Sequence, residues 1–437
     1  MSEYAADRKD RFTLDGNQNH NRPDSIAPIE LHSAQDAFRL HGLNRWTRLM
    51  VSLAPQLSRG SITIGLPDGR RVIARGPEAG PDTEITLRNN RFPKRMLLGG
   101  NLGVGQSYVE GDFDCDDLAT LSEWACRNGE LDDTLMGKPW LRVLRRLAFA
   151  FSTNSKRGSR RNIAYHYDLG NDFYRLWLDP SMTYSSAVYE HPGQSLEAAQ
   201  AAKYRRLAGE VLRLSPGETV LEVGCGWGGF ACLAAKEFGV SVHAITISRE
   251  QHDFAKRRVF EAGLADKVQV ELRDYRDTQG TYDAIASIEM IEAVGEKYWP
   301  TYFDMLRQRL HDTAHGKAGR AALQAIVIQD KYFEAYRGTM DFIQAYIFPG
   351  GLLLSPQSIR DQAAQAGLQV TRSDGFAQDY ARTLHEWTRD FSAAWPQIRA
   401  QGFDERFRRM WMWYLGYCEG GFRAETIDVL QLRLDPA

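Results

Sequence analysis

The sequence predicts an α/β fold in which a doubly wound, mainly parallel sheet follows a small N-terminal α+β domain. The first observation is a βαβ unit, in which an apolar run at 220–223 leads through a glycine-dense turn and a helical pattern to a second apolar run at 240–246. The second observation is that three later apolar runs alternate with helical patterns, and these runs span 268–272, 282–288 and 321–328.

Composition is that of a water-soluble globular protein. The chain has 437 residues, a length sufficient for two or three domains, and 43% of the residues are hydrophobic and 25% charged. The formal net charge of −2 gives no case for nucleic-acid binding. Five cysteines without a C-x-x-C pair predict neither a disulfide framework nor a zinc site, and we expect a reducing cytoplasm. With no signal peptide and no apolar run of membrane-spanning length in the sequence, we expect any membrane contact to be peripheral.

Four segments are expected along the chain. Residues 1–35 read as a loosely attached arm, and residues 36–135 as the small α+β domain. Within that domain, apolar runs at 61–66 and 71–74 flank a Pro-Asp-Gly turn and predict a hairpin, and a helix is predicted to begin near Asp117. Two segments follow, a basic linker helix and the catalytic domain, and they span 136–161 and 162–437.

The linker segment 136–161 carries eight lysines and arginines and no acid, and its apolar residues recur at helical spacing. A basic amphipathic helix of this kind can lie on the anionic inner face of a membrane. A solvated linker that packs its apolar stripe on the next domain is an equal alternative.

The turn after the first strand of the βαβ unit predicts a nucleoside site. Glu222 closes the strand, and glycines follow at 224, 226, 228 and 229. Glycine accepts positive φ and lets a ligand lie directly on the main chain. The spacing differs from the dinucleotide fingerprint. An acid followed by G-x-G-x-G resembles the S-adenosylmethionine (SAM) site of class I methyltransferases, whose fold we therefore expect here.

Several motifs in order resemble the family of cyclopropane-fatty-acyl-phospholipid synthases and mycolic acid cyclopropane synthases. The similarity covers about residues 160–425 and, more weakly, the small N-terminal domain. The motifs are His166 to Tyr174, Met182 to Ala187, Glu222 to Gly229, Ser287 to Gly295, Tyr346 to Gly351, and Trp413 to Phe422.

The resemblance implies attack of a cis alkene on a sulfonium methyl, which leaves a carbocation in the acyl chain. Aromatic faces and a prepositioned anion or base can stabilise and quench such a cation. In the family this base is thought to be bicarbonate. The resemblance places it among five residues, of which Glu292 would supply the anionic side chain; this predicted anion set is Ser186, Glu292, Gln324, the N–H of Ile326, and Tyr380.

Two members of the predicted anion set depart from the commonest family pattern. Ser186 stands where cysteine is usual, and Gln324 stands where histidine is usual. In addition, Ala293 follows Glu292 where a histidine is common. Serine and glutamine keep hydrogen-bonding capacity. These changes leave bicarbonate binding and the type of product open.

For SAM, the resemblance assigns Tyr184 and Ser185 to the methionine end and Gly224 with Gly226 to close backbone approach. It assigns five other positions to the ribose, the adenine and the methyl-transfer channel; these are Thr246 with Gln251, Tyr275 with Arg276, and Ile288. The aromatic cluster between Phe407 and Tyr417 predicts a packed helix face, part of which could line an acyl slot.

We therefore expect an enzyme that transfers the SAM methyl carbon to the double bond of an unsaturated acyl chain on a phospholipid, giving a cyclopropane or a methyl-branched product. Two alternatives remain: methylation of a small soluble substrate, and an inactive lipid-binding protein. The double-bond position, head group, redox partner and oligomeric state stay open, with a homodimer among the candidates.

Overall fold

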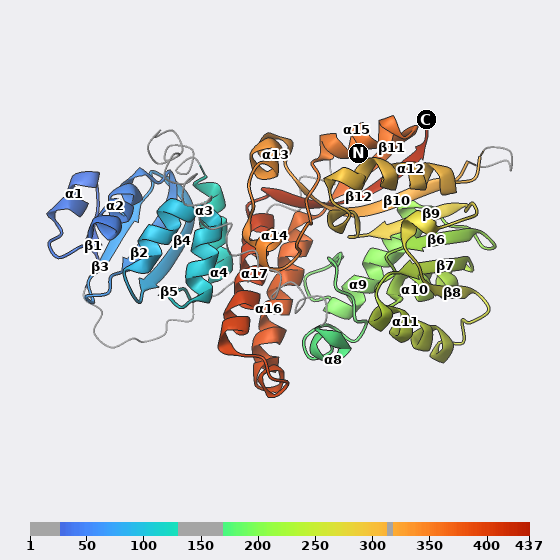
Figure 1. The fold of residues 1–437 in the computed structure, drawn as a ribbon, viewed down its shortest axis with the longest axis horizontal. Coiled ribbons are helices and arrows are strands. Elements are labelled where there is room, and N and C mark those ends of the chain that lie inside the picture. Colours follow the sequence, from blue (N-terminus) through green and yellow to red (C-terminus); the bar gives the residue numbers. More distant parts are fainter. Residues whose placement is uncertain (1–26, 130–168, 313–317) are drawn as a thin grey trace.

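The computed structural model describes residues 27–129, 169–312 and 318–437, and within them the chain forms two sheets (Figure 1). The larger has seven strands in the order β11-β12-β10-β9-β6-β7-β8. Its strands are β6 (Thr219–Val223), β7 (Ser241–Thr246), β8 (Val268–Leu272), β9 (Ala284–Ile288), β10 (Arg320–Ile328), β11 (Leu368–Gly375) and β12 (Ile427–Pro436). Strand β12 runs antiparallel to β10 and β11, whereas the pairs among β6 to β10 are parallel. The predicted mainly parallel α/β sheet is confirmed.

Helices cover both faces of this sheet. The helices of this part of the chain are α8 (Gly170–Tyr174), α9 (Leu196–Arg205), α10 (Gly229–Phe238), α11 (Arg249–Glu261), α12 (Trp299–Arg309), α13 (Asp330–Arg337), α14 (Phe342–Tyr346), α15 (Pro356–Gln365), α16 (Ala377–Ala400) and α17 (Glu405–Arg423). Neighbouring residues of β6 point to opposite faces, as the two-residue period of a strand requires. Val220 packs with α10 and α11 residues, and Leu221 packs with α12 and α15 residues.

The strand order places a topological switch point between β6 and β9. From β6 the chain runs outward through β7 and β8, and it then returns to the other side of β6 to form β9 and β10. Ligands of open α/β sheets bind in the crevice beyond the carboxyl ends of the strands at such a point. The segments that follow Val223 and Ile288 therefore lie where a ligand is expected.

The smaller sheet has the order β1-β3-β2-β4-β5. Its strands are β1 (Ile29–Glu30), β2 (Arg59–Gly65), β3 (Arg71–Arg75), β4 (Glu78–Leu87) and β5 (Phe113–Asp114), and its helices are α1 (Ala34–Arg39), α2 (Arg45–Leu53), α3 (Arg91–Val109) and α4 (Leu118–Arg127). The predicted hairpin is present as the antiparallel pair β2–β3. The predicted helix start is also present, because the Asp117 carboxylate caps α4 by accepting from the Thr120 amide at 2.8 Å.

The ordered N-terminal unit begins earlier than the sequence suggested. Strand β1 pairs in parallel with β3, and α1 starts at Ala34. Residues 29–35, which we assigned to a loose arm, therefore belong to the small sheet and its first helix. The other part of that arm, residues 1–26, and the basic linker helix predicted at 136–161 lie outside the described residues.

The small unit packs directly on the long helix α17, which lies beside α16 between the two sheets (Figure 1). Glycines make this approach possible. A Cβ at Gly416 would lie 2.6 Å from the Leu118 Cβ, and one at Gly420 would lie 2.6 Å from the Ala119 carbonyl oxygen. One hydrophobic cluster joins residues of both units. The predicted aromatic face of α17 is confirmed, with Phe407, Trp411 and Trp413 buried.

Within the described ranges, no helix combines the length and the hydropathy that a membrane span requires.

Candidate active site

The glycine turn after β6 leaves room for a ligand on the main chain. Gly224, Gly226 and Gly228 have φ of +81°, +51° and +81°, which side chains rarely adopt. A Cβ at Gly226 would meet no described atom within 4 Å, whereas one at Gly224 would lie 2.8 Å from the Met290 Cγ. The space beside Gly226 is therefore open at the switch point, as the SAM assignment of this turn requires.

Glu222 lies buried at the end of β6, 3% exposed. Its Oε2 has no hydrogen-bond partner among the described residues. Burial is the main reason that the pKa of this carboxyl is raised to about 8, while a hydrogen bond from the Ala231 amide and the charge of Lys203 act in the opposite direction. A buried carboxyl oxygen without a partner, beside an open glycine turn, fits a ligand that donates hydrogen bonds.

The other predicted SAM residues line the carboxyl ends of neighbouring strands. Thr246 ends β7, and its Oγ1 donates to the Gln251 Oε1 at 2.9 Å, so these two side chains lie together. Ile288 ends β9, next to β6. Tyr275 and Arg276 lie in a short 3₁₀ helix (Tyr275–Asp277) that follows β8. These positions therefore lie along the edge of the sheet where the parallel strands end.

The loop from Met182 to Ala187 crosses this edge and carries Tyr184 into an aromatic cluster. The Tyr184 hydroxyl shares a 2.6 Å hydrogen bond with the Tyr414 hydroxyl on α17. The Tyr184 ring lies 5.2 Å from the Trp387 ring and 5.3 Å from the Tyr174 ring, measured between centroids. Aromatic faces attract cations, so the cluster suits both a sulfonium and a carbocation.

Glu289, which the sequence analysis gave no role, is the centre of the polar part of the site. It follows β9 directly. Its carboxylate accepts four hydrogen bonds from groups on three other segments: Ser185 Oγ at 2.7 Å, the Ser186 amide at 2.9 Å, Gln324 Nε2 at 2.7 Å, and Tyr380 Oη at 2.6 Å. The first three donate to Oε1, and Tyr380 donates to Oε2.

The backbone at Glu289 is strained. Its φ is +49°, one of four positive values at non-glycine positions among the described residues. A second, Met182 at +54°, begins the loop that carries Ser185 and Ser186. Such strain costs on the order of 1–3 kcal/mol and persists only where surrounding contacts impose it. The contacts around Glu289 do so, since its side chain reaches all four donors from this conformation.

Glu292 forms a separate centre. Its Oε1 accepts a hydrogen bond of 2.5 Å from the Ile326 amide, and its Oε2 is buried without a partner among the described residues. Burial first, and then the negative charge of Glu289, raise the pKa of this carboxyl to about 8. Burial therefore favours the neutral form of Glu292, the residue that we expected to supply the anionic side chain.

The predicted anion set is thus divided between two carboxyl groups. The Ser186 amide, Gln324 and Tyr380 donate to Glu289, and the Ile326 amide donates to Glu292. The Ser186 hydroxyl, expected to act in place of cysteine, instead donates to the Ala187 carbonyl oxygen at 3.0 Å. Its substitution for cysteine therefore changes little at Glu289, because the main chain makes that contact.

Two further buried polar residues support Ser185 from α9. Lys203, completely buried, donates from Nζ to the Ser185 Oγ at 2.9 Å, and Gln200 donates to the Ser185 carbonyl oxygen at 2.7 Å. Burial lowers the pKa of Lys203 to about 7. Sequence reasoning missed both, although they fall on the same helical stripe as Leu196 and Ala199, where an apolar face is expected.

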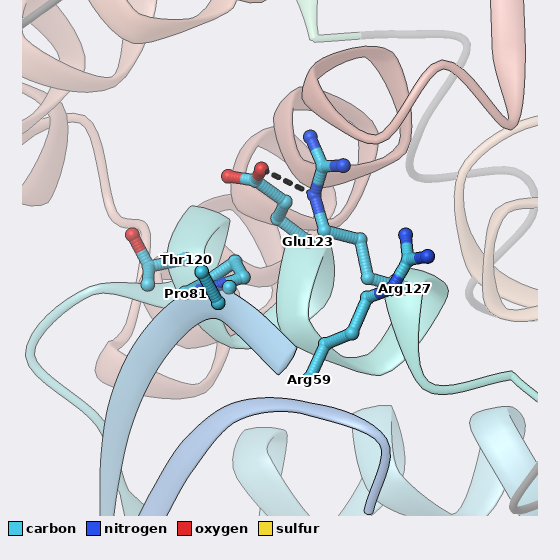
Figure 2. A pocket seen from close by; sticks show the side chains of 7 residues that line it. Arg59, Pro81, Thr120, Glu123 and Arg127 are labelled. Atoms are coloured by element: carbon cyan, nitrogen blue, oxygen red, sulfur yellow. Dashed lines mark hydrogen bonds and ion pairs between the residues drawn. The ribbon is translucent and has the colours of Figure 1, made fainter. Parts of the chain in front are cut away.

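A surface hollow in the small unit lies apart from this site (Figure 2). Its two arginines already pair with carboxylates: Arg59 Nε lies 2.9 Å from Glu78 Oε2, and Arg127 Nε lies 2.8 Å from Glu123 Oε1. It contains none of the predicted site residues, and we assign it no role.

Comparison with known proteins agrees with this geometry. The class is that of SAM-dependent methyltransferases, as shown by the family match and by solved structures with the same fold. Residues 154–432 match the family model described as mycolic acid cyclopropane synthetase, and the chain belongs to this family.

Two curated relatives share most of their length with this chain. A tuberculostearic acid methyltransferase of Mycobacterium tuberculosis is 38% identical over 377 residues, which cover 84% of this chain and 86% of the relative. A cyclopropane-fatty-acyl-phospholipid synthase of Escherichia coli is 38% identical over 351 residues, covering 80% and 87%. Both alignments are longer than the family match, so the similarity extends beyond its 279 residues.

Solved structures show the same fold. The mycolic acid cyclopropane synthase CmaA1, complexed with SAH and CTAB, superposes with a TM-score of 0.57 at 32% identity, covering 63% of this chain and 97% of that chain. The cyclopropane synthase MmaA2 from Mycobacterium tuberculosis also gives 0.57, at 30% identity and with the same coverage. The chain is a SAM-dependent methyltransferase of the cyclopropane synthase type.

The first prediction concerns the glycine turn. Gly226→Val should abolish measurable binding of S-adenosylhomocysteine in calorimetry, because the side chain would fill the open space beside the turn. Gly69→Val is the matched control: Gly69 also has positive φ (+88°) and open space, but it lies in the β2–β3 turn. Equal affinity in the two variants would remove the turn from the site.

The second prediction concerns Glu292. Because folding raises its pKa to about 8 from an ordinary value of 4.5, the folded protein holds the proton more tightly, and this stabilisation is lost as pH rises through 8. Between pH 6 and pH 9, the unfolding free energy of the parent should fall by at least about 1 kcal/mol more than that of Glu292→Gln. Parallel curves in urea unfolding at the two pH values would contradict the assignment.

Proposed function

We propose that this enzyme transfers the SAM methyl carbon to the double bond of an unsaturated acyl chain, and that the acyl chain belongs to a membrane phospholipid. The observation that carries the proposal is the Glu289 carboxylate, held by four donors within the aromatic surroundings of Tyr380. Transfer to an alkene creates a carbocation, which needs both an aromatic environment and a proton acceptor. Both occur together here.

The residues present fit SAM, and we assign its contacts as the sequence predicted. Gly224 and Gly226 would carry the ligand on their main chain, Thr246 and Gln251 would take the ribose, and Tyr275 with Arg276 would flank the adenine. Tyr184 and Ser185 would face the methionine end, and Ile288 would line the methyl-transfer channel. Bound SAM would supply an electrophilic methyl on a cationic sulfur, so that the alkene π pair forms the new C–C bond while the S–C pair returns to sulfur.

The chain's own residues would then manage the cation. Tyr380, whose hydroxyl donates to Glu289, has its ring 4.5 Å from that of Phe422 and 6.2 Å from that of Trp387, measured between centroids. Their faces can stabilise positive charge without reacting with it. Glu292, bound to the Ile326 amide, would shape the surroundings of the proton acceptor, and buried Lys203 would hold Ser185 in place.

The product that we propose is a cyclopropane, formed when the base removes a proton from the new methyl group. The second candidate is a methyl-branched alkene, formed when the proton leaves a neighbouring chain carbon, or a methylene product, formed when a hydride shift moves the cation to the methyl-bearing carbon before the methyl group loses the proton. It is favoured by the similarity to the tuberculostearic acid methyltransferase. The family resemblance also suggests that bicarbonate binds here. Bicarbonate would need the donors to which the Glu289 carboxylate is now bound.

Two other functions are less well supported. A nucleophilic amine or hydroxyl substrate would not need a carboxylate with four donors beside an aromatic cluster. An inactive lipid-binding protein would have no use for the strained Glu289 and the open Gly226 turn.

We also propose that the enzyme works in the cytoplasm as a peripheral protein on the inner face of the membrane, either alone or as a homodimer. The support is the basic segment 136–161, since an acyl chain in a bilayer must be reached from its surface.

The third prediction concerns the product. With SAM that carries a trideuterated methyl group and vesicles of monounsaturated phospholipid, the product acyl chain should carry two deuteriums in a cyclopropane ring, resolved by gas chromatography and mass spectrometry. Retention of all three deuteriums would rule out ring closure and establish the methylating alternative. No labelled lipid, with methylation of a soluble acceptor, would contradict the acyl substrate.

The fourth prediction concerns the membrane. At about 1 kcal/mol for each basic residue near an anionic surface, reversing three charges should lower binding about a hundredfold, and salt should weaken binding in the parent. The variant is Arg142→Glu/Arg145→Glu/Arg146→Glu, and the measurement is co-sedimentation with phosphatidylglycerol vesicles. The matched control reverses three exposed charges on α10 and α11, Lys236→Glu/Lys256→Glu/Arg257→Glu. Equal vesicle binding by both variants would favour the alternative in which this segment is only a linker.

A further inference from the structure

We propose that Glu289 is the built-in base of this enzyme: its carboxylate fills the anion position of the site and takes the proton from the cation, so that the reaction needs no bicarbonate. This inference rests on the proposed function and names the residue that completes its chemistry.

The first support is occupancy. An added bicarbonate would have to be held by the predicted anion set, and four of its groups are hydrogen-bond donors: the Ser186 hydroxyl or amide, Gln324, the Ile326 amide and Tyr380. In the structure the Ser186 amide, Gln324 and Tyr380 already donate to Glu289, and the Ile326 amide donates to Glu292. The Ser186 hydroxyl donates to a backbone carbonyl. Each donor has a partner, and the partner at the centre is a carboxylate of this chain.

The second support is the arrangement of donors on the two oxygens. Oε1 of Glu289 accepts three hydrogen bonds, from Ser185, the Ser186 amide and Gln324. Oε2 accepts one among the described residues, from Tyr380. A carboxylate has about four acceptor positions on its two oxygens, so Oε1, with three donors, is crowded, while Oε2, with one, keeps a position for a proton. The donors thus fix the carboxylate and leave one oxygen able to act as a base.

The third support is that neighbouring groups hold Glu289 as a rigid acceptor. Gln324 is itself positioned by Gln431 on β12, which donates to its Oε1 at 3.0 Å and so turns its Nε2 toward Glu289. Lys203 donates to the Ser185 Oγ, which directs the hydroxyl proton of Ser185 toward Glu289. The backbone amide of Glu289 donates to the Gln324 carbonyl oxygen at 2.7 Å. A base held in this way needs no reorganisation during proton transfer.

The proton step balances without another reactant. The methyl transfer leaves a carbocation on the acyl chain, and Glu289 Oε2 accepts one proton. If the proton leaves the new methyl group, its C–H electron pair forms the second ring bond of a cyclopropane. If the proton leaves a chain carbon next to the cationic centre, its C–H electron pair forms the C=C bond of a methyl-branched alkene; a methylene product forms when a hydride shift first brings the cation to the methyl-bearing carbon and the proton then leaves the methyl group. Glu289 is left protonated and returns its proton to solvent after product release.

The test exploits the strained backbone. Glu289→Gly removes the side chain at a position with φ of +49°, a value that glycine adopts readily, and leaves a cavity for a small anion. Glu289→Gln fills the same space without a base. Turnover is measured on monounsaturated phospholipid vesicles in carbonate-free buffer, with and without added sodium bicarbonate or formate, and SAM affinity is measured by calorimetry.

The expected result has three parts. The parent turns over equally with and without bicarbonate. Both variants lose about 100-fold in turnover with SAM affinity kept, as is typical for a lost general base. Bicarbonate or formate restores at least tenfold to Glu289→Gly and nothing to Glu289→Gln. Glu425→Gly is the matched control, because Glu425 also has positive φ (+57°) but lies after α17, and its turnover should equal the parent's.

A parent that needs bicarbonate, a Glu289→Gly variant as active as the parent in carbonate-free buffer, or a loss that no anion rescues would overturn the proposal. Absence of turnover by the parent on any unsaturated lipid would instead overturn the proposed function. In that case, ¹³C-bicarbonate binding, followed by NMR line width, still tests whether Glu289 fills the anion position. Binding by Glu289→Gly and not by the parent supports this, and equal binding by the parent overturns it.

Discussion

The structure of the site depends on one carboxylate, that of Glu289. Its four hydrogen bonds draw together the loop at 185–186, strand β10 through Gln324, and helix α16 through Tyr380. These segments are up to about two hundred positions apart in the chain, and no apolar contact would fix their polar groups in register. The positive φ of Glu289 shows that local backbone preference was overridden by this requirement. Lys203 and Gln431 complete the arrangement from α9 and β12.

Much of the fold could be predicted from the sequence because it rests on local signals. The apolar runs at 220–223 and 240–246 with an intervening glycine turn specify a βαβ unit, and Asp117 marks a helix start by its capping side chain. The lower limit of the small domain was misplaced, since the two-residue strand β1 carries too little pattern to be seen before its pairing with β3 is known.

The site was predicted unevenly. The residues that we propose for SAM are tied to strand ends, and the topology brings strand ends together, so the placement of Gly226, Thr246 and Gln251 at one edge of the sheet could be predicted from sequence. The division of the anion set between Glu289 and Glu292 could not, because it depends on which of two nearby carboxyl groups reaches Tyr380 and Gln324. The role of Ser186 was also hidden, since its contribution comes from the main chain. Lys203 was missed because a lysine on a helix is ordinarily exposed.

The most direct test of the central claim is a crystal structure of the parent enzyme with S-adenosylhomocysteine and an alkyl ligand, grown in bicarbonate buffer. The account predicts that the Glu289 carboxylate lies between Tyr380 and Gln324 at hydrogen-bond distance from both, with its Oε2 toward the ligand and no further anion in contact with these donors. Density for bicarbonate between Tyr380 and Gln324, with the Glu289 side chain turned away, would contradict it.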